Sequence, residues 1–296
     1  MRRLAGILLS ICVVWGWASI ASGQEKSGVT TPPPKVLVVA REFMKPGRAG
    51  TPHEKSESAF VQAMMHAKWP THYLAVDAVS GKPRSLFLTG YDSFDAWEKD
   101  ANAEQKNAVL SAAIDRASLA DGDLQSDADT SVLVYREDLS LRPNVDIAHM
   151  RSFDITLIRV KPGHSKDFEA IAKMYMTGWE GTPDVHWALY EATYGQVNDT
   201  YVVFSPLKSA SEIDHNIASG KDFESKLGED GMKKMSELES AAIESMQSNL
   251  FLFNPRMSYV SPDWVKADPE FWTVKSGTGM AAAPKKLAKT APSGAN

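Results

Sequence analysis

The sequence is nearly free of cysteine: Cys12 is the only one among 296 residues. It lies in an apolar run that follows Arg2 and Arg3 and ends in small residues at 21–23, the pattern of a secretory signal peptide. We therefore expect residues 1–23 to be removed, the alternative being an uncleaved membrane anchor. The exported chain would then have no cysteine, which excludes disulfide bonds and thiolate metal sites.

Two further features are missing from the rest of the chain. No segment after residue 23 is apolar over the length that a membrane-spanning helix needs, and no basic stripe is present. Loss of Arg2 and Arg3 would take the formal net charge from −5 to −7. These features argue against binding to nucleic acid or to an anionic membrane, and we expect a periplasmic or extracellular protein.

Catalytic signatures are also absent. The sequence has no readable Ser-His-Asp arrangement, no glycine-rich phosphate loop and no HxH, HxxxH or HExxH spacing. Neither a metal site nor a cofactor is predicted, and whether the protein is an enzyme stays open at this point.

What the chain does contain is an internal repeat. The stretch THYLAVDAVSG at 71–81 aligns without a gap on VHWALYEATYG at 185–195. The alignment pairs His72 with His186, Tyr73 with Trp187, Asp77 with Glu191, and Gly81 with Gly195.

Each copy of the repeat lies in a βαββαβ pattern. Apolar alternation and turn residues predict strands at 35–43, 71–79, 85–89 and 131–136, and again at 153–160, 185–193, 201–205 and 249–254. Helices are predicted at 53–69 and 93–119, with counterparts that end near 179 and begin near 209. The predicted organisation is a signal peptide at 1–23, a proline-rich linker at 24–34, units at 35–143 and 150–262, and an extension at 263–296 that is disordered from about 276.

Two such units, with Tyr91-Asp92-Ser93-Phe94 leading into the second helix, resemble the dimeric α/β-barrel superfamily. Antibiotic-biosynthesis-monooxygenase-like and NIPSNAP-like proteins are members. The resemblance covers about residues 35–260 and implies an α+β fold, in which two tandem ferredoxin-like units pair their antiparallel sheets into an intramolecular α/β barrel. Such a pseudo-dimer would be a monomer or form a homodimer. The superfamily includes cofactor-free oxygenases and haem proteins, so the fold leaves the function open.

Strand alternation divides the repeated stretch between two faces. Because a helix-packed face tolerates a buried carboxylate poorly, we predict that Tyr73, Asp77, Trp187 and Glu191 face the lumen and bind a ligand. In the alternative, the aromatic rings fill the barrel and the carboxylates lie near strand ends, in water or against an arginine.

The remaining candidates are histidines and arginines. His72 and His186 are expected to be exposed or bonded to the backbone rather than to bind haem or metal. His53 and His164 begin the first helix of each unit, but no neighbouring residue completes a metal site. Arg41, Arg136 and Arg159 lie on strands or at strand ends, where they either form ion pairs or hold an acidic ligand.

We therefore expect an exported protein that binds a small apolar or aromatic molecule in the barrel lumen. Two alternatives stay open. The protein is a cofactor-free or haem-dependent monooxygenase-like enzyme, or it is a structural or protein-interaction module with a filled barrel.

Overall fold

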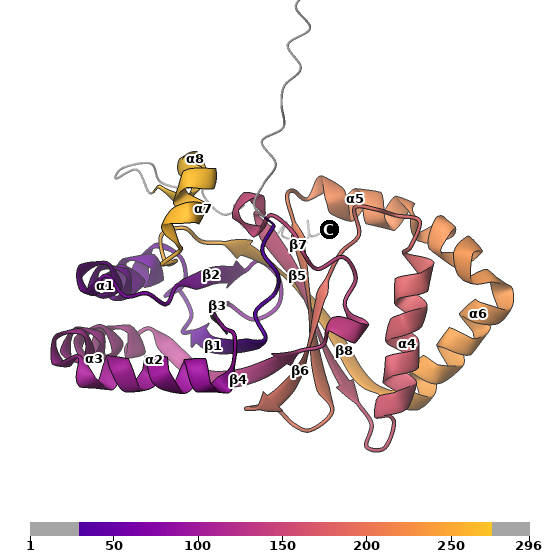
Figure 1. Ribbon diagram of the computed structural model, residues 1–296, viewed down its shortest axis with the longest axis horizontal. Coiled ribbons are helices and arrows are strands. Elements are labelled where there is room, and N and C mark those ends of the chain that lie inside the picture. The colour runs from indigo at the N-terminus through magenta and orange to yellow at the C-terminus, as the bar shows by residue number, and fades with distance from the viewer. Residues whose placement is uncertain (1–29, 274–296) are drawn as a thin grey trace, which may run out of the picture.

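The computed structural model describes residues 30–273 and shows two βαββαβ units in one barrel (Figure 1). The first unit consists of β1 (Val36–Met44), α1 (Thr51–Ala67), β2 (Tyr73–Ala78), β3 (Arg84–Tyr91), α2 (Phe94–Lys106), α3 (Ala108–Gly122) and β4 (Gln125–Tyr135). The second consists of β5 (Ser152–Val160), α4 (Ser165–Gly178), β6 (Ala188–Tyr194), β7 (Thr200–Leu207), α5 (Ser211–Ala218), α6 (Gly220–Ala242) and β8 (Ile243–Phe253). The predicted signal peptide, the start of the linker and the tail from 276 lie outside the described residues.

The eight strands close a barrel in the order β1-β3-β2-β8-β5-β7-β6-β4, and all neighbouring pairs are antiparallel. Two seams join the units. At one, Val76 of β2 lies opposite Phe253 of β8, and at the other, Val134 of β4 lies opposite Glu191 of β6. The predicted α+β fold, with two tandem ferredoxin-like units in one intramolecular barrel, is confirmed.

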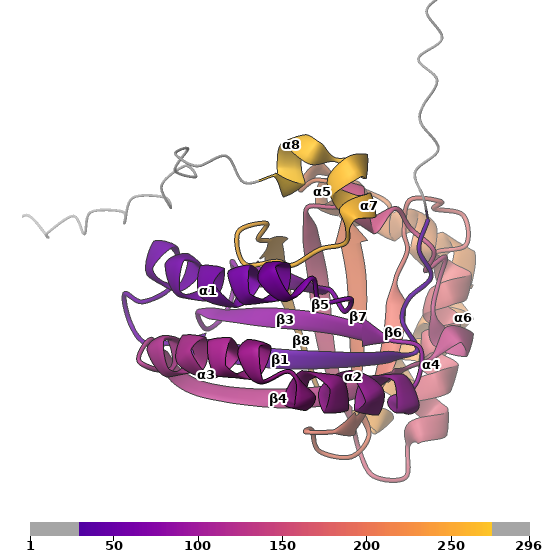
Figure 2. The same cartoon turned by 60° about the vertical axis from the view of Figure 1, so that its left-hand side comes forward.

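The helices cover the outside of the barrel (Figures 1 and 2). Helices α1, α2 and α3 lie on the strands of the first unit, and α4 and α6 lie on those of the second. Ser93 caps α2, because its side chain accepts a hydrogen bond from the backbone N–H of Ala96. Within residues 30–273, no helix is long and apolar enough to span a membrane.

The segment between the units and the C-terminal segment pack on one end of the barrel. Two short 3₁₀ turns, η1 (Glu137–Leu139) and η2 (Ile147–His149), join the units, and α7 (Pro262–Ala267) and α8 (Pro269–Trp272) follow β8. Trp272 is buried against Phe253, and its indole N–H donates to the backbone oxygen of Ala148.

Two strands begin six residues earlier than the sequence predicts. β4 starts at Gln125 rather than 131, and β8 starts at Ile243 rather than 249. Side chains 126–130 and 244–248 are exposed although their backbones pair with β1 and β5. They are mostly polar because they meet water, and so they show no apolar alternation that marks a strand.

The duplication extends to the register in which the strands of each unit pair. β1 and β5 have equal lengths, as do β3 and β7. Glu42 of β1 lies opposite Ser85 of β3, and at the equivalent place in the second unit Ile158 of β5 lies opposite Tyr201 of β7. The two units therefore share a backbone register but differ in the side chains on it.

The turn after β6 depends on a glycine that lies close to β4. Gly195 has a φ of +78°, and a β-carbon there would overlap the backbone oxygen of Thr130. Gly163 also has a positive φ, +87°, but nothing lies within 4 Å of an added β-carbon.

We expect Gly163→Ala to lower the free energy of unfolding by about 1 kcal/mol, because alanine is strained in the left-handed backbone conformation. Gly195→Ala should cost at least about 2 kcal/mol more, because β4 must shift. Urea denaturation followed by circular dichroism measures both, and equal losses would contradict the role of this close approach.

Candidate functional site

The side chains that fill the barrel come from one face of each strand. Leu74 and Val76 of β2 and Tyr190 of β6 belong to a single buried cluster that also contains Phe204 and Phe251. Because successive side chains of a strand point to opposite faces, residues 73, 75 and 77 of β2 and residues 189 and 191 of β6 point outward. The lumen face is thus the one opposite to the face predicted from the sequence.

The four predicted site residues therefore belong to the outer face, and their predicted lumen orientation is corrected. The prediction rested on the poor tolerance of a helix-packed face for a buried carboxylate. Asp77 is tolerated there because two donors satisfy it: Ser85 Oγ lies 2.5 Å from Oδ1, and Asn254 Nδ2 lies 2.7 Å from Oδ2. Tyr73 packs with the ring of Phe87 on the same face and, like Trp187, only borders the larger cavity described below.

The two counterparts in the second unit form different contacts. Trp187 is buried in the apolar cluster under α4, and its indole N–H donates to the backbone oxygen of Leu139 at 3.0 Å. Glu191 accepts a hydrogen bond from Arg136 Nη1 at 3.0 Å, and 44% of its side chain is exposed. Glu191 therefore matches the alternative given in the sequence analysis, in which the carboxylate lies in water against an arginine.

The lumen itself contains two cavities, one toward each end. The smaller one has a volume of about 400 Å³. Its walls are apolar side chains, among them Leu133, Ile155 and Phe204. Its polar atoms come largely from cations and amides, namely Arg41, Lys82, Arg84, Arg159, Gln196, Gln247 and Asn249. Among residues 30–273, no aspartate or glutamate lines it.

The three arginines of this cavity are not equivalent. Arg41 is neutralised by Asp129, whose Oδ2 lies 2.7 Å from Nη2. Arg84 donates to the backbone oxygen of Lys82 and lies over the ring of Phe251, 4.8 Å from its centre. Burial, and then the charge of Arg41, lower the pKa of Arg84. Arg159 has a buried Nε without a hydrogen-bond partner. Within residues 30–273, neither Arg84 nor Arg159 forms an ion pair with a carboxylate.

The larger cavity, about 930 Å³, opens at the other end of the barrel. The prolines at 32–34 border it, so the end of the predicted linker packs on the barrel, where Thr31 forms a β-bridge with Val145. Apolar walls come from Leu37, Leu88, Tyr190 and other lumen residues. The polar lining includes Asp100, which accepts hydrogen bonds from Thr71 and Tyr91 and is thereby satisfied.

The two repeated histidines border this larger cavity, but they do not fit the role of a haem ligand. His186 Nε2 lies 2.8 Å from the backbone oxygen of Pro206, which can only accept, so Nε2 carries the proton and has no lone pair for iron. The ring of His72 is stacked on that of Tyr259, with the ring centres 4.8 Å apart.

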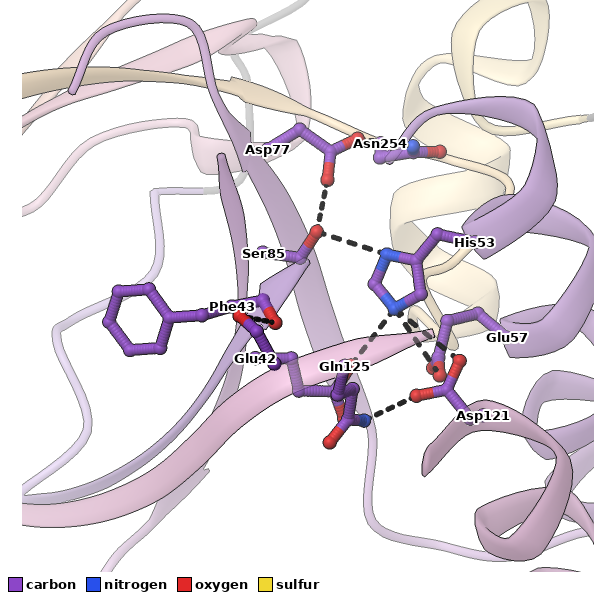
Figure 3. A network of polar contacts seen from close by, with 10 residues as sticks. Glu42, Phe43, His53, Glu57, Asp77, Ser85, Asp121, Gln125 and Asn254 are labelled. Carbon is purple, nitrogen blue, oxygen red and sulfur yellow. Dashed lines mark hydrogen bonds and ion pairs between the residues drawn. The ribbon is translucent and has the colours of Figure 1, made fainter. Parts of the chain in front are cut away.

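A second polar assembly lies outside the lumen, between the sheet and α1 (Figure 3). It surrounds His53, which the sequence left without partners. The side chains around this histidine come from β1, α1, β3 and α3: Glu42, Glu57, Ser85 and Asp121. Sequence spacing could not reveal the assembly, because its members are distributed from residue 42 to residue 121 and only the fold brings them together.

Comparisons with known proteins bear on the fold. No family model and no curated protein sequence matches. Similar solved structures include a candidate monooxygenase from Fusobacterium nucleatum, 15% identical over 75% of this chain and 94% of that chain, with a TM-score of 0.49. A chlorite dismutase variant from Candidatus Nitrospira defluvii is 10% identical over 79% of this chain and 95% of that chain, with a TM-score of 0.44. At these identities the likeness concerns the fold alone, so the chemistry must be argued from the residues present.

The aligned carboxylates Asp77 and Glu191 should differ in their effect on stability. Asp77→Asn replaces an acceptor by an amide that faces two donors, and we expect the free energy of unfolding to fall by about 1 to 3 kcal/mol. Glu191→Gln removes one of three carboxylates around an arginine in a half-exposed place, and we expect a loss below about 1 kcal/mol. Urea denaturation of both variants tests this order, and a larger loss for Glu191→Gln would contradict the assigned contacts.

Proposed function

We propose that the protein binds a small molecule with an apolar or aromatic body and an anionic group, in the smaller cavity of the lumen. The observation that carries the proposal is the pair Arg84 and Arg159, two cations without acidic partners among apolar walls. Export, inferred from the pattern of residues 1–23, is part of the same proposal.

The electrostatics of the cavity favour an anion. Arg84 and Arg159 are partly buried, and a partly buried charge without a counter-charge carries a cost that a bound carboxylate or similar group would offset. Guanidinium groups hold planar oxyanions through paired hydrogen bonds. The sequence left open whether Arg41, Arg136 and Arg159 form ion pairs or hold a ligand, and the contacts divide them: Arg41 and Arg136 are paired with acids, and Arg159 is not.

The apolar part of the cavity fits the rest of such a ligand. Phe204 and Phe251 supply aromatic surface beside the arginines. A volume of about 400 Å³ lies in the lower part of the range typical of ligand sites, which indicates a small ligand rather than a large cofactor. Cavities of this size support a binding protein over a module with a filled barrel.

Acid and neutral ligands of the same shape test the proposal. We expect 1-naphthoate to bind at least about tenfold more tightly than 1-naphthylmethanol, which has a similar ring but no charge. Isothermal titration calorimetry measures both. Arg159→Gln and Arg84→Gln should each remove most of the difference while leaving the weaker binding of the alcohol in place.

The matched control is Arg116→Gln on the exposed side of α3, which should bind both compounds as the unchanged protein does. Equal affinity for acid and alcohol in the unchanged protein would refute the role of the arginines. Absence of binding by either compound would contradict a lumen site for aromatic ligands.

The oxygenase alternatives are tested on the same protein. Oxygen uptake with a hydroquinone would favour the cofactor-free enzyme, and a Soret band after addition of haem would favour the haem-dependent one.

A further inference from the structure

Four side chains converge between the sheet and helices α1 and α3. Glu42 comes from β1, His53 and Glu57 from the first turns of α1, and Asp121 from the end of α3. One potential ligand atom from each lies within 4.8 Å of all the others. His53 and Asp121 are 1% exposed, and Glu57 is 3% exposed. The side chain of Glu42 is 18% exposed, so the cluster is compact and largely, but not fully, closed to solvent.

Two oxygens in this cluster have no hydrogen-bond partner. Glu57 Oε1 and Asp121 Oδ1 are buried, and neither receives a hydrogen bond. They lie 3.8 Å and 3.6 Å from His53 Nε2, too far for hydrogen bonds but close enough to surround one shared ion. The other oxygen of Asp121 is held by Gln125 Nε2, so the side chain is oriented with Oδ1 toward the centre.

The opposite side of the imidazole ring is held in place by a chain of hydrogen bonds (Figure 3). Asp77 accepts from Asn254 at one oxygen and lies 2.5 Å from Ser85 Oγ at the other. The single hydroxyl hydrogen of Ser85 therefore goes to Asp77, and Oγ is left to accept from His53 Nδ1–H at 3.3 Å. Nε2 faces the three carboxylates and shares a proton with Glu42 Oε2 at 2.9 Å, and loss of that proton to solvent leaves a neutral imidazole with its lone pair on Nε2. Metal-binding histidines are commonly oriented in this way.

The charges of the cluster are not balanced by protein groups. Within the described part of the chain, His53 is the only basic residue within ion-pair distance of Glu42, Glu57 or Asp121. A divalent cation would supply the missing positive charge.

The second unit shows that the fold does not require this polarity. The equivalents of Glu42 and Ser85 are Ile158 and Tyr201. There Tyr201 stacks on Phe168 of α4 with ring centres 4.2 Å apart, and all three residues belong to an apolar cluster. The same place between sheet and helix is thus an ordinary core in one unit and a carboxylate–histidine cluster in the other.

We propose that Glu42, His53, Glu57 and Asp121 bind one divalent first-row transition-metal ion, which ties α1 and α3 to the sheet. Four protein ligands in a closed environment are typical of a structural site. One imidazole with three carboxylates suits Mn²⁺, Fe²⁺ or Zn²⁺, whereas Ca²⁺ takes six to eight oxygens and Mg²⁺ retains several waters. The site is separate from the lumen and does not depend on the proposed function.

The test uses the whole protein after treatment with EDTA and removal of the chelator. On titration with Mn²⁺, the six-line electron paramagnetic resonance signal of the free ion should disappear until a single ion per chain is bound. Zn²⁺ should remain at the same ratio after gel filtration, as measured by elemental mass spectrometry. Either metal should raise the melting temperature by about 5 °C or more, and Mg²⁺ and Ca²⁺ at the same concentrations should raise it less.

Variants separate this site from surface binding and from misfolding. His53→Gln should abolish binding, and Ser85→Ala should weaken it about 10- to 100-fold through loss of the orienting hydrogen bond. His164→Gln is the matched control, because His164 lies at the start of the equivalent helix, is partly exposed and contacts only Asp167 among the carboxylates. This variant should bind metal as the unchanged protein does.

The double change Glu57→Gln with Asp121→Asn guards against a variant that merely fails to fold. It removes two of the three crowded carboxylates, so its melting temperature in EDTA should not fall, while metal binding is lost. Retention of binding by this folded variant would overturn the proposal. Failure of the unchanged protein to bind Mn²⁺ or Zn²⁺ would also overturn it, and the cluster would then be a group of carboxylates that share protons with His53.

Discussion

Closure of the barrel at its two seams is the constraint on which the rest of the structure depends. The β2–β8 and β4–β6 pairs leave no free edge where they form, and each pair fixes which side chains of its strands point inward. Once Val76 lies inside opposite Phe253, Asp77 must lie outside. A shift by one residue would put a carboxylate into the apolar lumen and expose a row of aliphatic side chains. The positions of both proposed sites follow from this single choice of register.

The choice separates two electrostatic environments on opposite faces of one sheet. The lumen contains cations among apolar walls, and the outer face under α1 contains carboxylates around one histidine. β1 contributes to both, because Arg41 points into the barrel and Glu42 points away from it. Neighbouring residues of one strand can therefore belong to sites of opposite charge, since the sheet lies between them.

The fold could be predicted from the sequence because its evidence is distributed and redundant. The repeat and the order of apolar segments both point to two copies of one unit, and an error in any single strand does not change that conclusion. The starts of β4 and β8 were missed because Asp127 and its neighbours face water on both sides of the strand. The pattern of apolar residues along a chain reports which side chains are buried. These residues form strand pairs although their side chains are exposed.

The face of β2 could not be predicted in the same way. Leu74 and Val76 alternate with Tyr73 and Ala75, so both faces read as apolar, and only Asp77 could decide between them. The cost of burying that carboxylate pointed to the lumen. The cost is offset by Ser85 and Asn254, and the second of these lies in the other half of the chain. A prediction made from one strand alone cannot include Asn254, because only closure of the barrel brings this donor next to Asp77.

The internal duplication explains how one half of the molecule can carry a polar cluster that the other half lacks. The lumen is shared, so a change on its surface must fit side chains from both units. The outer faces share fewer contacts, because each is covered mainly by the helices of its own unit, although Asn254 from the second half reaches Asp77. Under α4, Ile158, Tyr201 and Phe168 provide stability by apolar burial. Under α1, Glu42, His53, Glu57 and Asp121 bury polar groups that gain stability only when their charges are matched. A fold built from two equal units can therefore keep one outer face as plain core, while the other can depend on a bound ion.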